Sequence, residues 1–462
     1  MIHLDIKELL PVDKNIWITG ITDNSKEVKK GYLFVATKGY HVDHFDYIED
    51  AIQKGCVFLV VDKEISFSFP HIVVEEIEKA YKELCIKFYG VDLKKLHLIG
   101  ITGTDGKTTT ATIVKELIKD CAYLGTNGLI IRRKSISTKN TTPCISELYK
   151  DFSLIQKECI KTVSMEVSSE ALLHQRISNL QFDVVAFTNI TGDHMNIHKT
   201  LDEYKKCKLK LLELVKENGV VIVNGDDTNL QNIHCQNLYT FGFGINNDYQ
   251  IKCVKELPKK TEIILYGKEE YKLITPLKGK FNVYNVVQAF LIGLFYGVDK
   301  ELLLQRLMKI KRISGRYESL NFGQDYDIIL DYAHTINAIE NILEIPVKGR
   351  RIVVTGCAGG RDWGKRPKIG KIIMEKSDVS IFTMDDPRYE KVDDIINQMV
   401  GHEKRYIRIP NREEAISYAL SIAKAGDKVF ILGKGRDNYM AIENKKVPYN
   451  DYKVIKNYFQ KR

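Results

Sequence analysis

The amino-acid sequence predicts an α/β protein built of three domains. Two observations support this prediction: the chain has 462 residues, and from about residue 96 apolar β-branched runs alternate with helix-like segments. A chain of this length exceeds one ordinary domain. Continuous apolar runs are typical of parallel strands that helices cover on both faces. Because the pattern changes near residues 96 and 314, we place the domains at residues 1–95, 96–313 and 314–462.

The individual strands are predicted from the same runs. In the first domain they lie at residues 32–36, 56–61 and 71–74, with a helix near 79–89. In the second they lie at 96–101, 162–165, 184–188 and 220–224, and in the third at 327–330, 351–355, 379–383 and 428–432. The strands of the last two domains end in, or run into, polar or glycine residues. Ligands of doubly wound sheets bind beyond the carboxyl ends of the strands, so we expect the functional residues there.

The composition excludes several classes of protein. The net charge of +9 comes from lysines scattered along the chain, without the clustered basic face of a nucleic-acid-binding protein. The nine cysteines form no Cys-x-x-Cys pair, which argues against a disulfide framework or a structural zinc site. No apolar run approaches the roughly 20 residues that span a bilayer, and the first residues lack a signal-like apolar core. We expect a cytoplasmic protein that neither binds nucleic acid nor spans a membrane.

A glycine-rich loop follows the strand predicted at residues 96–101. It consists of Gly103, Thr104, Asp105, Gly106, Lys107, Thr108 and Thr109, and a helix-like segment comes next. The glycines let backbone N–H groups point at phosphate oxygens, Lys107 supplies a charge to the β and γ phosphates, and Thr108 offers a hydroxyl to Mg²⁺. Gly100 stands one residue further from Gly106 than in the usual pattern. The loop predicts ATP binding and by itself leaves kinase, GTPase and ligase open.

Two neighbouring strand ends carry groups that bind metals. Glu166 follows the strand at 162–165, and Asp193 and His194 follow the strand at 184–188, with His198 close behind. A carboxylate and an imidazole at adjacent strand ends beside a phosphate loop predict a divalent-metal site.

Further motifs occur in a fixed order along nearly the whole chain. They are Asn24-Ser25-Lys26, Leu33-Phe34-Val35-Ala36, Asn140-Thr141-Thr142-Pro143, Glu166-Val167-Ser168-Ser169, Thr188-Asn189, Asp193-His194, Phe281-Asn282-Val283-Tyr284-Asn285, Gly315-Arg316, Asp331-Tyr332-Ala333-His334-Thr335, Gly364-Lys365-Arg366-Pro367, Asp385-Asp386-Pro387-Arg388 and Gly433-Lys434-Gly435. Together with the loop, this set resembles the Mur ligases, and most closely the UDP-N-acetylmuramoyl-tripeptide synthetases. The resemblance implies a small N-terminal UDP-binding α/β domain, a central P-loop ATPase-like domain with a mostly parallel sheet, and a C-terminal Rossmann-like domain.

The resemblance also implies a reaction. An ATP-dependent, ADP-forming amide ligase of this kind adds a diamino acid to UDP-N-acetylmuramoyl-L-alanyl-D-glutamate in peptidoglycan precursor synthesis. ATP phosphorylates the terminal carboxylate, the amino group attacks the acyl phosphate, and phosphate leaves. Concentrated negative charge requires cations, so two Mg²⁺ ions and Lys107 are expected to stabilise it. Lys107, Glu166, His194 and Lys208 would be catalytic.

The same resemblance assigns a metal role to Lys208. An ammonium cannot ligate a metal, but the CO₂ adduct of a lysine is an anion that can, so Lys208 is expected as a carbamate. Lys205, Lys206 and Lys210 crowd the same predicted helix, and only the position ten residues after His198 selects Lys208. The implied metal-binding set is Thr108, Glu166, His194 and carbamylated Lys208.

The remaining site residues are carried over from the family motifs. ATP would contact the loop residues, with Asn282, Arg316, Asp331 and His334. The UDP-muramoyl-dipeptide would contact Ser25, Tyr40, His41, Val42, Asn140, Thr141, Thr142, Ser168, His174 and Arg176, since arginine forks suit phosphate. The amino acid would contact Arg361, Asp385, Asp386, Pro387, Arg388, Gly433 and Asp437.

Arg388 bears on which amino acid is added. Its guanidinium has an evident partner in a second carboxylate, which diaminopimelate has and lysine lacks, and an unpaired buried arginine would be costly. The chain departs from the commoner family pattern at Asp386 (asparagine), Asp437 (glutamate), Gly360 (aspartate), Glu170 (histidine) and His174 (glutamine). We favour meso-2,6-diaminopimelate and expect a monomer.

Several alternatives remain open at this point. They are a lysine-adding ligase of the same family and a catalytically silent nucleotide-binding paralogue. A ligase that adds D-alanyl-D-alanine would not be expected to carry the motifs at 385–388 and 433–437. Folylpolyglutamate synthetase would begin near the phosphate loop, without about 95 upstream residues.

Overall fold

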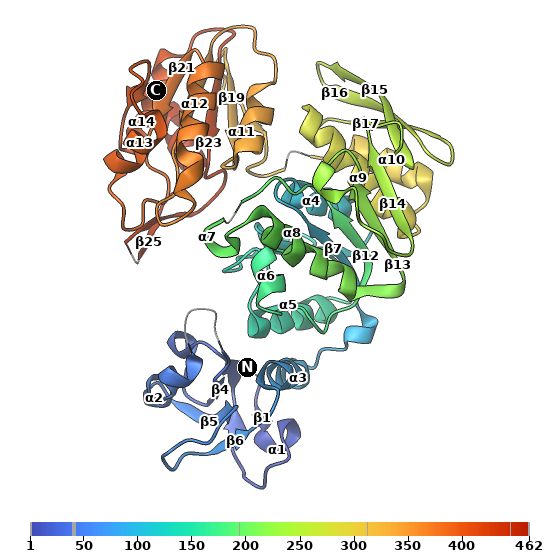
Figure 1. The fold of residues 1–462 in the computed structure, drawn as a ribbon, viewed down its shortest axis with the longest axis vertical. Coiled ribbons are helices and arrows are strands. Elements are labelled where there is room, and N and C mark those ends of the chain that lie inside the picture. The colour runs from blue at the N-terminus through green and yellow to red at the C-terminus, as the bar shows by residue number, and fades with distance from the viewer. Residues whose placement is uncertain (1, 39–42, 194, 312, 444, 461–462) are drawn as a thin grey trace.

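The computed structural model describes residues 2–38, 43–193, 195–311, 313–443 and 445–460, apart from the side chain of Asn196. It confirms the predicted α/β class, with separate sheets of four, eleven and six strands along the chain. Figure 1 shows the N-terminal part at one end of the molecule and the C-terminal part at the other, with the central part between and beside them. Within the described ranges, no helix is both long and apolar enough to cross a membrane.

The N-terminal part contains a parallel four-stranded sheet. Its order is β3 (Gly20–Thr22), β4 (Tyr32–Val35), β5 (Cys56–Val61) and β6 (His71–Val73). The other elements are β1 (Leu4–Asp5), α1 (Ile6–Leu9), β2 (Trp17–Ile18), η1 (Ser25–Glu27), η2 (His44–Tyr47), α2 (Ile48–Gln53), α3 (Ile77–Tyr89) and the connecting turn η3 (Leu93–Lys95). The three predicted strands and the helix are confirmed, and β3 was not predicted. Helix α3 buries a stripe at Ile77, Tyr81, Leu84 and Phe88, the spacing of an amphipathic helix.

The central sheet has eleven strands. Its strands are β7 (His97–Thr102), β8 (Cys121–Gly125), β9 (Gly128–Ile131), β10 (Lys134–Ile136), β11 (Thr162–Glu166), β12 (Phe182–Phe187), β13 (Val215–Asn224), β14 (Leu238–Gly242), β15 (Tyr249–Leu257), β16 (Lys260–Tyr266) and β17 (Glu270–Thr275). The order is β10-β9-β8-β11-β7-β12-β13-β14-β15-β16-β17, with a parallel middle from β8 to β15 and antiparallel strands at both edges. The four predicted strands are confirmed. Because β7 lies between β11 and β12 and is parallel to both, the carboxyl ends of these three strands lie side by side.

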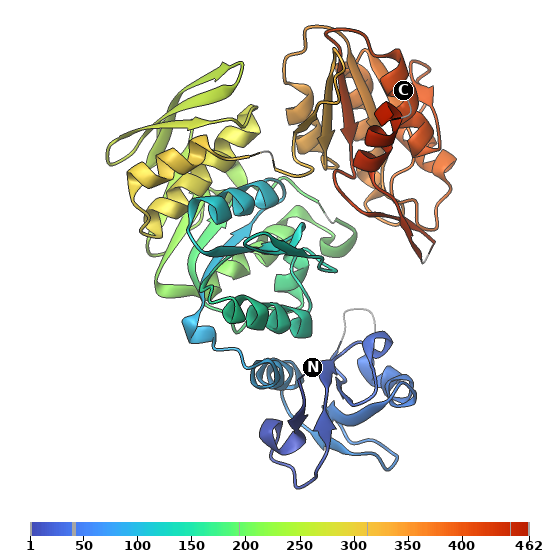
Figure 2. The same ribbon diagram turned by 180° about the vertical axis from the view of Figure 1, so that it is seen from behind.

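Helices cover both faces of this sheet, as continuous apolar strands require. They are α4 (Lys107–Leu117), α5 (Ile145–Lys157), α6 (Ser169–Leu173), α7 (Met195–His198), α8 (Leu201–Leu209), η4 (Lys210–Leu214), η5 (Thr228–Leu230), α9 (Lys280–Phe295) and α10 (Lys300–Met308). Adjacent residues of β7 pack in different cores: Leu98 with Leu148 of α5, and Ile99 with Ile113 of α4. Figure 2 shows α4 and α5 from behind.

The C-terminal part contains a six-stranded sheet in the order β18-β19-β23-β20-β21-β22, parallel except for β18. Its elements are β18 (Glu318–Leu320), β19 (Asp327–Asp331), α11 (Ile336–Leu343), β20 (Arg351–Thr355), η6 (Trp363–Lys365), α12 (Arg366–Lys376), β21 (Val379–Phe382), α13 (Val392–Val400), β22 (Ile407–Arg408), α14 (Arg412–Ile422), β23 (Lys428–Leu432) and α15 (Asp451–Gln460). The hairpin formed by β24 (Tyr439–Ile442) and β25 (Lys445–Pro448) stands apart from this sheet. The four predicted strands are confirmed.

A buried ion pair joins α14 to the start of α15. The Arg412 guanidinium donates to both carboxylate oxygens of Asp451 at 2.9 and 2.8 Å and to the carbonyl of Leu432 at 2.8 Å. Both side chains are fully buried. The pair therefore ties two helices to the carboxyl end of β23.

Replacing Arg412 by methionine should lower the free energy of unfolding of the C-terminal domain by about 3–5 kcal/mol, because Asp451 keeps a buried charge without the opposite charge of the guanidinium. The matched control is Arg408→Met, whose partner Asp393 is largely exposed. An exposed pair contributes at most about 1 kcal/mol. Denaturant unfolding of both variants measures the difference, and equal losses would contradict this account of the buried pair.

Candidate active site

The phosphate loop lies between β7 and α4 and has the backbone that its glycines predict. Gly103 has φ +146° and Gly106, the residue before α4, has φ +85°, a region that favours glycine. A Cβ atom on Gly103 would lie 1.9 Å from the Thr188 hydroxyl, and one on Gly106 2.4 Å from the Asn285 side-chain oxygen. Larger residues would open the loop, so both glycines are required by its shape.

Two lysine amines converge on this loop. Lys107 Nζ donates to the carbonyls of Gly103 and Thr104, both at 2.9 Å, and Lys208 Nζ donates to the same Gly103 carbonyl at 2.8 Å. Burial lowers the pKa of Lys107. Burial, and next the positive charge of Lys107, lower the pKa of Lys208 well below its usual value. The two amines thus lie where phosphate oxygens would contact the loop.

The structure separates Lys208 from the other lysines of its helix. Lys208 is 1% exposed, whereas Lys205 is half-buried and Lys206 and Lys210 are exposed. Its amine also lies 4.6 Å from the ring centroid of Tyr204. A lowered pKa favours the neutral, nucleophilic form of a buried lysine amine, which is the form that reacts with CO₂.

Glu166 lies at the end of β11 and is 1% exposed. Its carboxylate accepts hydrogen bonds from the Tyr123 hydroxyl, the Thr126 backbone N–H at 3.0 Å and the Thr108 hydroxyl at 2.9 Å. Arg316 donates to the Thr108 hydroxyl at 2.9 Å. The Glu166 and Thr108 oxygens are the hard ligands that Mg²⁺ prefers, so their chemistry fits this ion.

The other predicted metal ligands behave differently. His194 lies outside the described residues. Its neighbour Asp193 forms an ion pair with Lys365 at 3.3 Å, and the His334 Nε2 atom lies 3.7 Å from the same carboxylate; both residues belong to the C-terminal part. Across the part of the chain that the structure describes, no three His, Cys, Asp or Glu side chains gather as a metal site.

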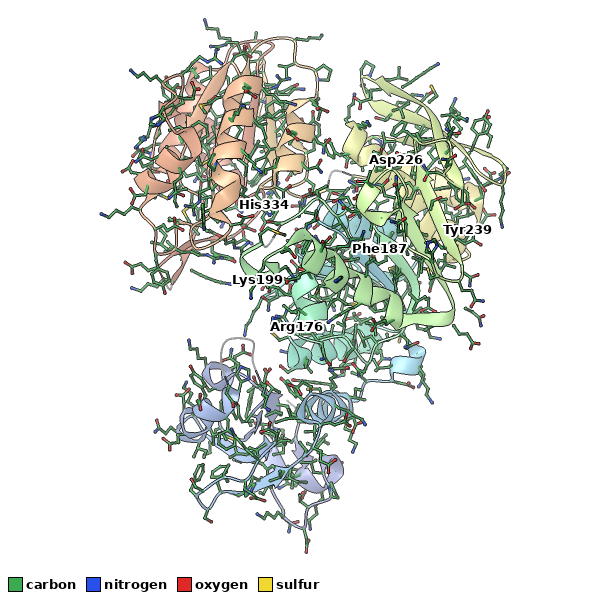
Figure 3. The ribbon with its side chains drawn as sticks, in the orientation of Figure 1. Arg176, Phe187, Lys199, Asp226, Tyr239 and His334 are labelled. Atoms are coloured by element: carbon green, nitrogen blue, oxygen red, sulfur yellow. The ribbon has the colours of Figure 1, made fainter. Side chains whose placement is uncertain are left out.

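Asp105 of the loop joins the central and C-terminal parts. The Thr335 hydroxyl lies 3.0 Å from each Asp105 carboxylate oxygen, and the Asn337 amide donates to one of them at 3.4 Å. In Figure 3, His334 lies where the C-terminal domain faces the central one. The Asp105 side chain, predicted as an ATP contact, here holds the two domains together beside the loop.

A first cavity of about 440 Å³ lies on one side of the loop. Of the predicted ATP contacts, its lining includes Asp105, Gly106, Thr109, Arg316, Asp331 and His334. Asn282 does not line it, because this side chain is buried and donates to the Lys278 carbonyl at 2.8 Å. Two residues of the same helix, Tyr284 and Asn285, line the cavity instead.

The lining of this cavity contains several polar groups that were not predicted from the sequence, among them Asp226. The Asp226 carboxylate accepts from the Tyr284 hydroxyl at 2.7 Å and from the Gly244 backbone N–H at 2.9 Å. Asp226 follows β13 within a polar segment, so the rule that ligands bind at strand ends could have selected it.

A second cavity of about 650 Å³ extends from the loop to the C-terminal sheet. Its lining brings together most of the predicted residues, namely Thr104, Asp105, Gly106, Lys107, Thr108, Asn140, Thr141, Glu166, Ser168, Arg176, Lys208, Arg316, His334, Arg361, Asp385, Asp386, Arg388, Gly433 and Asp437. Arg176 comes from the side of the central domain that faces the N-terminal domain (Figure 3). Residues from four predicted groups therefore share one space.

Some predicted substrate contacts are not in this lining. Ser25 is buried in the N-terminal domain, and Tyr40, His41 and Val42 lie outside the described residues. Neither His174 nor Pro387 lines the cavity. Thr142 is fully buried and has a structural contact: its hydroxyl donates to the Glu166 carbonyl at 2.8 Å.

The far end of the second cavity contains groups of both signs. Lys434 is 1% exposed, and its amine lies 3.7, 2.7 and 3.4 Å from carboxylate oxygens of Asp385, Asp386 and Asp437. Burial alone would lower the pKa of Lys434, but these carboxylates outweigh it and raise the pKa. Three carboxylates around one ammonium leave an excess of negative charge.

Arginines lie opposite this acidic group. Arg388 and Arg361 both line the cavity, and burial, followed by the charge of Arg361, lowers the pKa of Arg388. Lys434 belongs to one of the sequence motifs, but no contact with a substrate was predicted for it. No local pattern indicates its role, because its partner Asp386 is 48 residues away along the chain.

The chain is similar to known proteins over most of its length. Residues 17–88 match a family model described as "Mur ligase family, catalytic domain", residues 101–293 match "Mur ligase middle domain", and residues 315–435 match "Mur ligase, glutamate ligase domain". A protein of Bacillus licheniformis is 36% identical over 458 residues, covering 95% of this chain and 94% of that protein. One of Aquifex aeolicus is 34% identical over 459 residues, covering 95% and 93%. Both are named UDP-N-acetylmuramoyl-L-alanyl-D-glutamate–2,6-diaminopimelate ligase.

Solved structures resemble the chain over its whole length. A structure of a UDP-N-acetylmuramoyl-L-alanyl-D-glutamate–2,6-diaminopimelate ligase is 26% identical, with a TM-score of 0.65 and 99% of each chain covered. A MurF ligase of Thermotoga maritima in complex with ADP is 18% identical and shares the fold, with a TM-score of 0.66 over 96% of this chain and 97% of that one.

Proposed function

The chain belongs to the Mur ligase family, and from this premise we propose that it adds meso-2,6-diaminopimelate to UDP-N-acetylmuramoyl-L-alanyl-D-glutamate. It would act as an ATP-dependent, ADP-forming ligase in peptidoglycan precursor synthesis. Relatives with 34–36% identity over nearly the full length carry the name of this activity. The observation that supports it most directly is the second cavity, because the phosphate loop and the Arg388 end open into the same space.

The shared cavity suits a reaction in two steps. The substrate carboxylate attacks the γ-phosphorus of ATP, releasing ADP, and the amino group then attacks the acyl phosphate and releases phosphate. Holding donor, acceptor and nucleophile in one cavity replaces encounters in solution by a positioned reaction. Lys107 and the loop N–H groups would bind the phosphates, which replace the carbonyls that Lys107 contacts now.

Glu166 and Thr108 are proposed as magnesium ligands, with Lys208 as a carbamate and His194 as predicted. Bound Mg²⁺ would neutralise the charge between ATP and the carboxylate. The hydrogen bond between Thr108 and Glu166 places two ligand oxygens 2.9 Å apart. The buried Lys208 amine lies beside the loop, and its anionic CO₂ adduct would supply a further oxygen ligand.

The charges at the far end of the cavity match the distal end of diaminopimelate, which is itself an ammonium beside a carboxylate. Arg388 and Arg361 would bind the carboxylate, and the acidic group around Lys434 would face the ammonium. Lysine would offer only the ammonium. The acidic group thus keeps a lysine-adding ligase as the second candidate, and the arginines favour diaminopimelate.

A pH dependence follows from Asp437. Burial raises the pKa of Asp437 to about 6. As the pH falls through this value the carboxyl takes up a proton, so the cavity loses negative charge and should bind diaminopimelate several-fold more weakly at pH 5 than at pH 7.5. Calorimetric titration of diaminopimelate at several pH values, with ATP analogue and UDP-substrate present, measures the change. Asp437→Asn should flatten it, and an unchanged curve in this variant would assign the dependence to another group.

Phosphate release from ATP tests the function itself. We expect release only when both the UDP-muramoyl-dipeptide and an amino acid are present, with mass spectrometry of the product identifying the amino acid. A panel of meso-diaminopimelate, L-lysine and other diamino acids separates the two candidates. Failure with every diamino acid would support a silent nucleotide-binding paralogue instead.

We further propose that the protein acts as a monomer in the cytoplasm.

A further inference from the structure

The hairpin β24–β25 forms a wall of the second cavity although it lies outside the six-stranded sheet. In the described sheets its two strands pair only with each other. Figure 1 shows the hairpin extending from the body of the C-terminal domain. Tyr439, Ala441, Glu443, Lys445 and Lys446 line the cavity. The contacts that hold this hairpin in place therefore decide the shape of the cavity at the Arg388 end.

Backbone hydrogen bonds dock the hairpin on Arg388. The Arg388 N–H donates to the Ala441 carbonyl at 2.9 Å, and the Glu443 N–H donates to the Arg388 carbonyl at 2.7 Å. Arg388 has φ +53°, in the left-handed region. A non-glycine residue keeps that conformation only where its surroundings hold it. The hairpin supplies this hold at both backbone groups of Arg388.

Asp386 connects the hairpin to the buried lysine. One carboxylate oxygen of Asp386 accepts from the Ala441 N–H at 2.9 Å and from Lys434 Nζ at 2.7 Å. The same amine lies 5.7 Å from the ring centroid of Tyr439 in β24. This oxygen of Asp386 is thus occupied by groups of the protein, although the sequence predicted Asp386 as a contact of the amino-acid substrate.

We propose that Asp386, together with Lys434, is a positioning residue that docks the hairpin, and that the docked hairpin aims Arg388 at the carboxylate of the incoming amino acid. The hairpin is then a specificity element of the ligase. It would act on substrates with a distal carboxylate and leave ATP and the UDP-substrate unaffected. This inference rests on the proposed function of the cavity.

Asp386→Ala separates this role from a general structural one. The KM for meso-diaminopimelate should rise at least tenfold, with kcat changed less than threefold and the KM values for ATP and the UDP-substrate changed less than twofold. Asp386→Asn keeps an oxygen acceptor for Ala441 and Lys434, so it should recover most of the lost affinity. An unchanged KM for diaminopimelate, or equal rises for all three substrates, would overturn the proposal.

Ala441→Pro tests the contact between Asp386 and Ala441 by removing its donor. Both backbone groups of Ala441 face residues 386–388, so proline removes the donor to Asp386 and leaves the pairing with β25 intact. If the two substitutions break one contact, the double variant should be no worse than the worse single variant. Additive losses would contradict the proposal. Thermal unfolding of each variant controls for folding.

Amide hydrogen exchange measures whether the hairpin is docked, and it needs no substrate. In Asp386→Ala the N–H groups of Arg388 and Glu443 should exchange at least tenfold faster, while those in β23 keep their protection. Unchanged exchange would refute the docking role even if the wild type proved inactive with diaminopimelate. Conversely, an inactive wild type whose Asp386→Ala variant shows the faster exchange would overturn the proposed function and support the docking.

Discussion

Replacing Lys208 by alanine is expected to lower kcat about 10³-fold, the size of effect seen when one preorganised electrostatic group is removed from an active site. The amine is buried, lies 2.8 Å from the Gly103 carbonyl and has a strongly lowered pKa, so it is available for reaction with CO₂. Small carboxylates such as formate or acetate should partly restore the activity, because they can occupy the space of the lost carbamate. Phosphate release measures both effects.

Lys206→Ala is the matched control, since Lys206 is exposed on the same helix. It should change kcat less than twofold. A ¹³C resonance that forms with ¹³CO₂ in the wild type and is missing in Lys208→Ala would identify the adduct directly. Full activity of the unrescued Lys208 variant would remove this lysine from the mechanism.

Replacing Arg388 by alanine should lower kcat/KM for meso-diaminopimelate about 10²-fold. Truncating one partner of a hydrogen-bonded charge pair in an interface costs about 2–5 kcal/mol, and each 1.4 kcal/mol is about tenfold. Any activity with L-lysine should fall less than about threefold, because lysine has no distal carboxylate. The amino-acid panel on wild type and variant measures the two losses side by side.

Arg388→Lys is the informative companion variant. Lysine keeps the charge but lacks the planar fork that binds a carboxylate through two parallel hydrogen bonds, so the loss should be intermediate. Equal losses with diaminopimelate and lysine in Arg388→Ala would show that Arg388 supports the pocket in general and does not read the second carboxylate.

The sequence was sufficient for the features that depend on local pattern. Strands β5, β20 and β23 have the predicted bounds, because a strand buried on both faces needs a continuous apolar run that ends where polar residues begin. The phosphate loop was likewise readable, since its glycines are required by the backbone itself. The edge strands β10, β16 and β17 of the central sheet were not predicted, because exposed or half-buried residues interrupt their apolar pattern.

Only the tertiary structure decided how the predicted residues act. From the sequence, only its position distinguished Lys208 from three other lysines of the same segment. In the structure Lys208 alone of the four is buried, with its amine beside the Gly103 carbonyl. Asp386 and Asn282 were predicted to contact ligands. In the structure Asp386 accepts a hydrogen bond from the Ala441 N–H of the hairpin, and Asn282 donates one to the Lys278 carbonyl. The partners of Asp386 cannot be predicted from sequence spacing, because these contacts span 48 and 55 residues. The apolar pattern along the chain determines the strands, but the partners of a polar side chain depend on which distant segments the packed sheets bring within hydrogen-bonding distance.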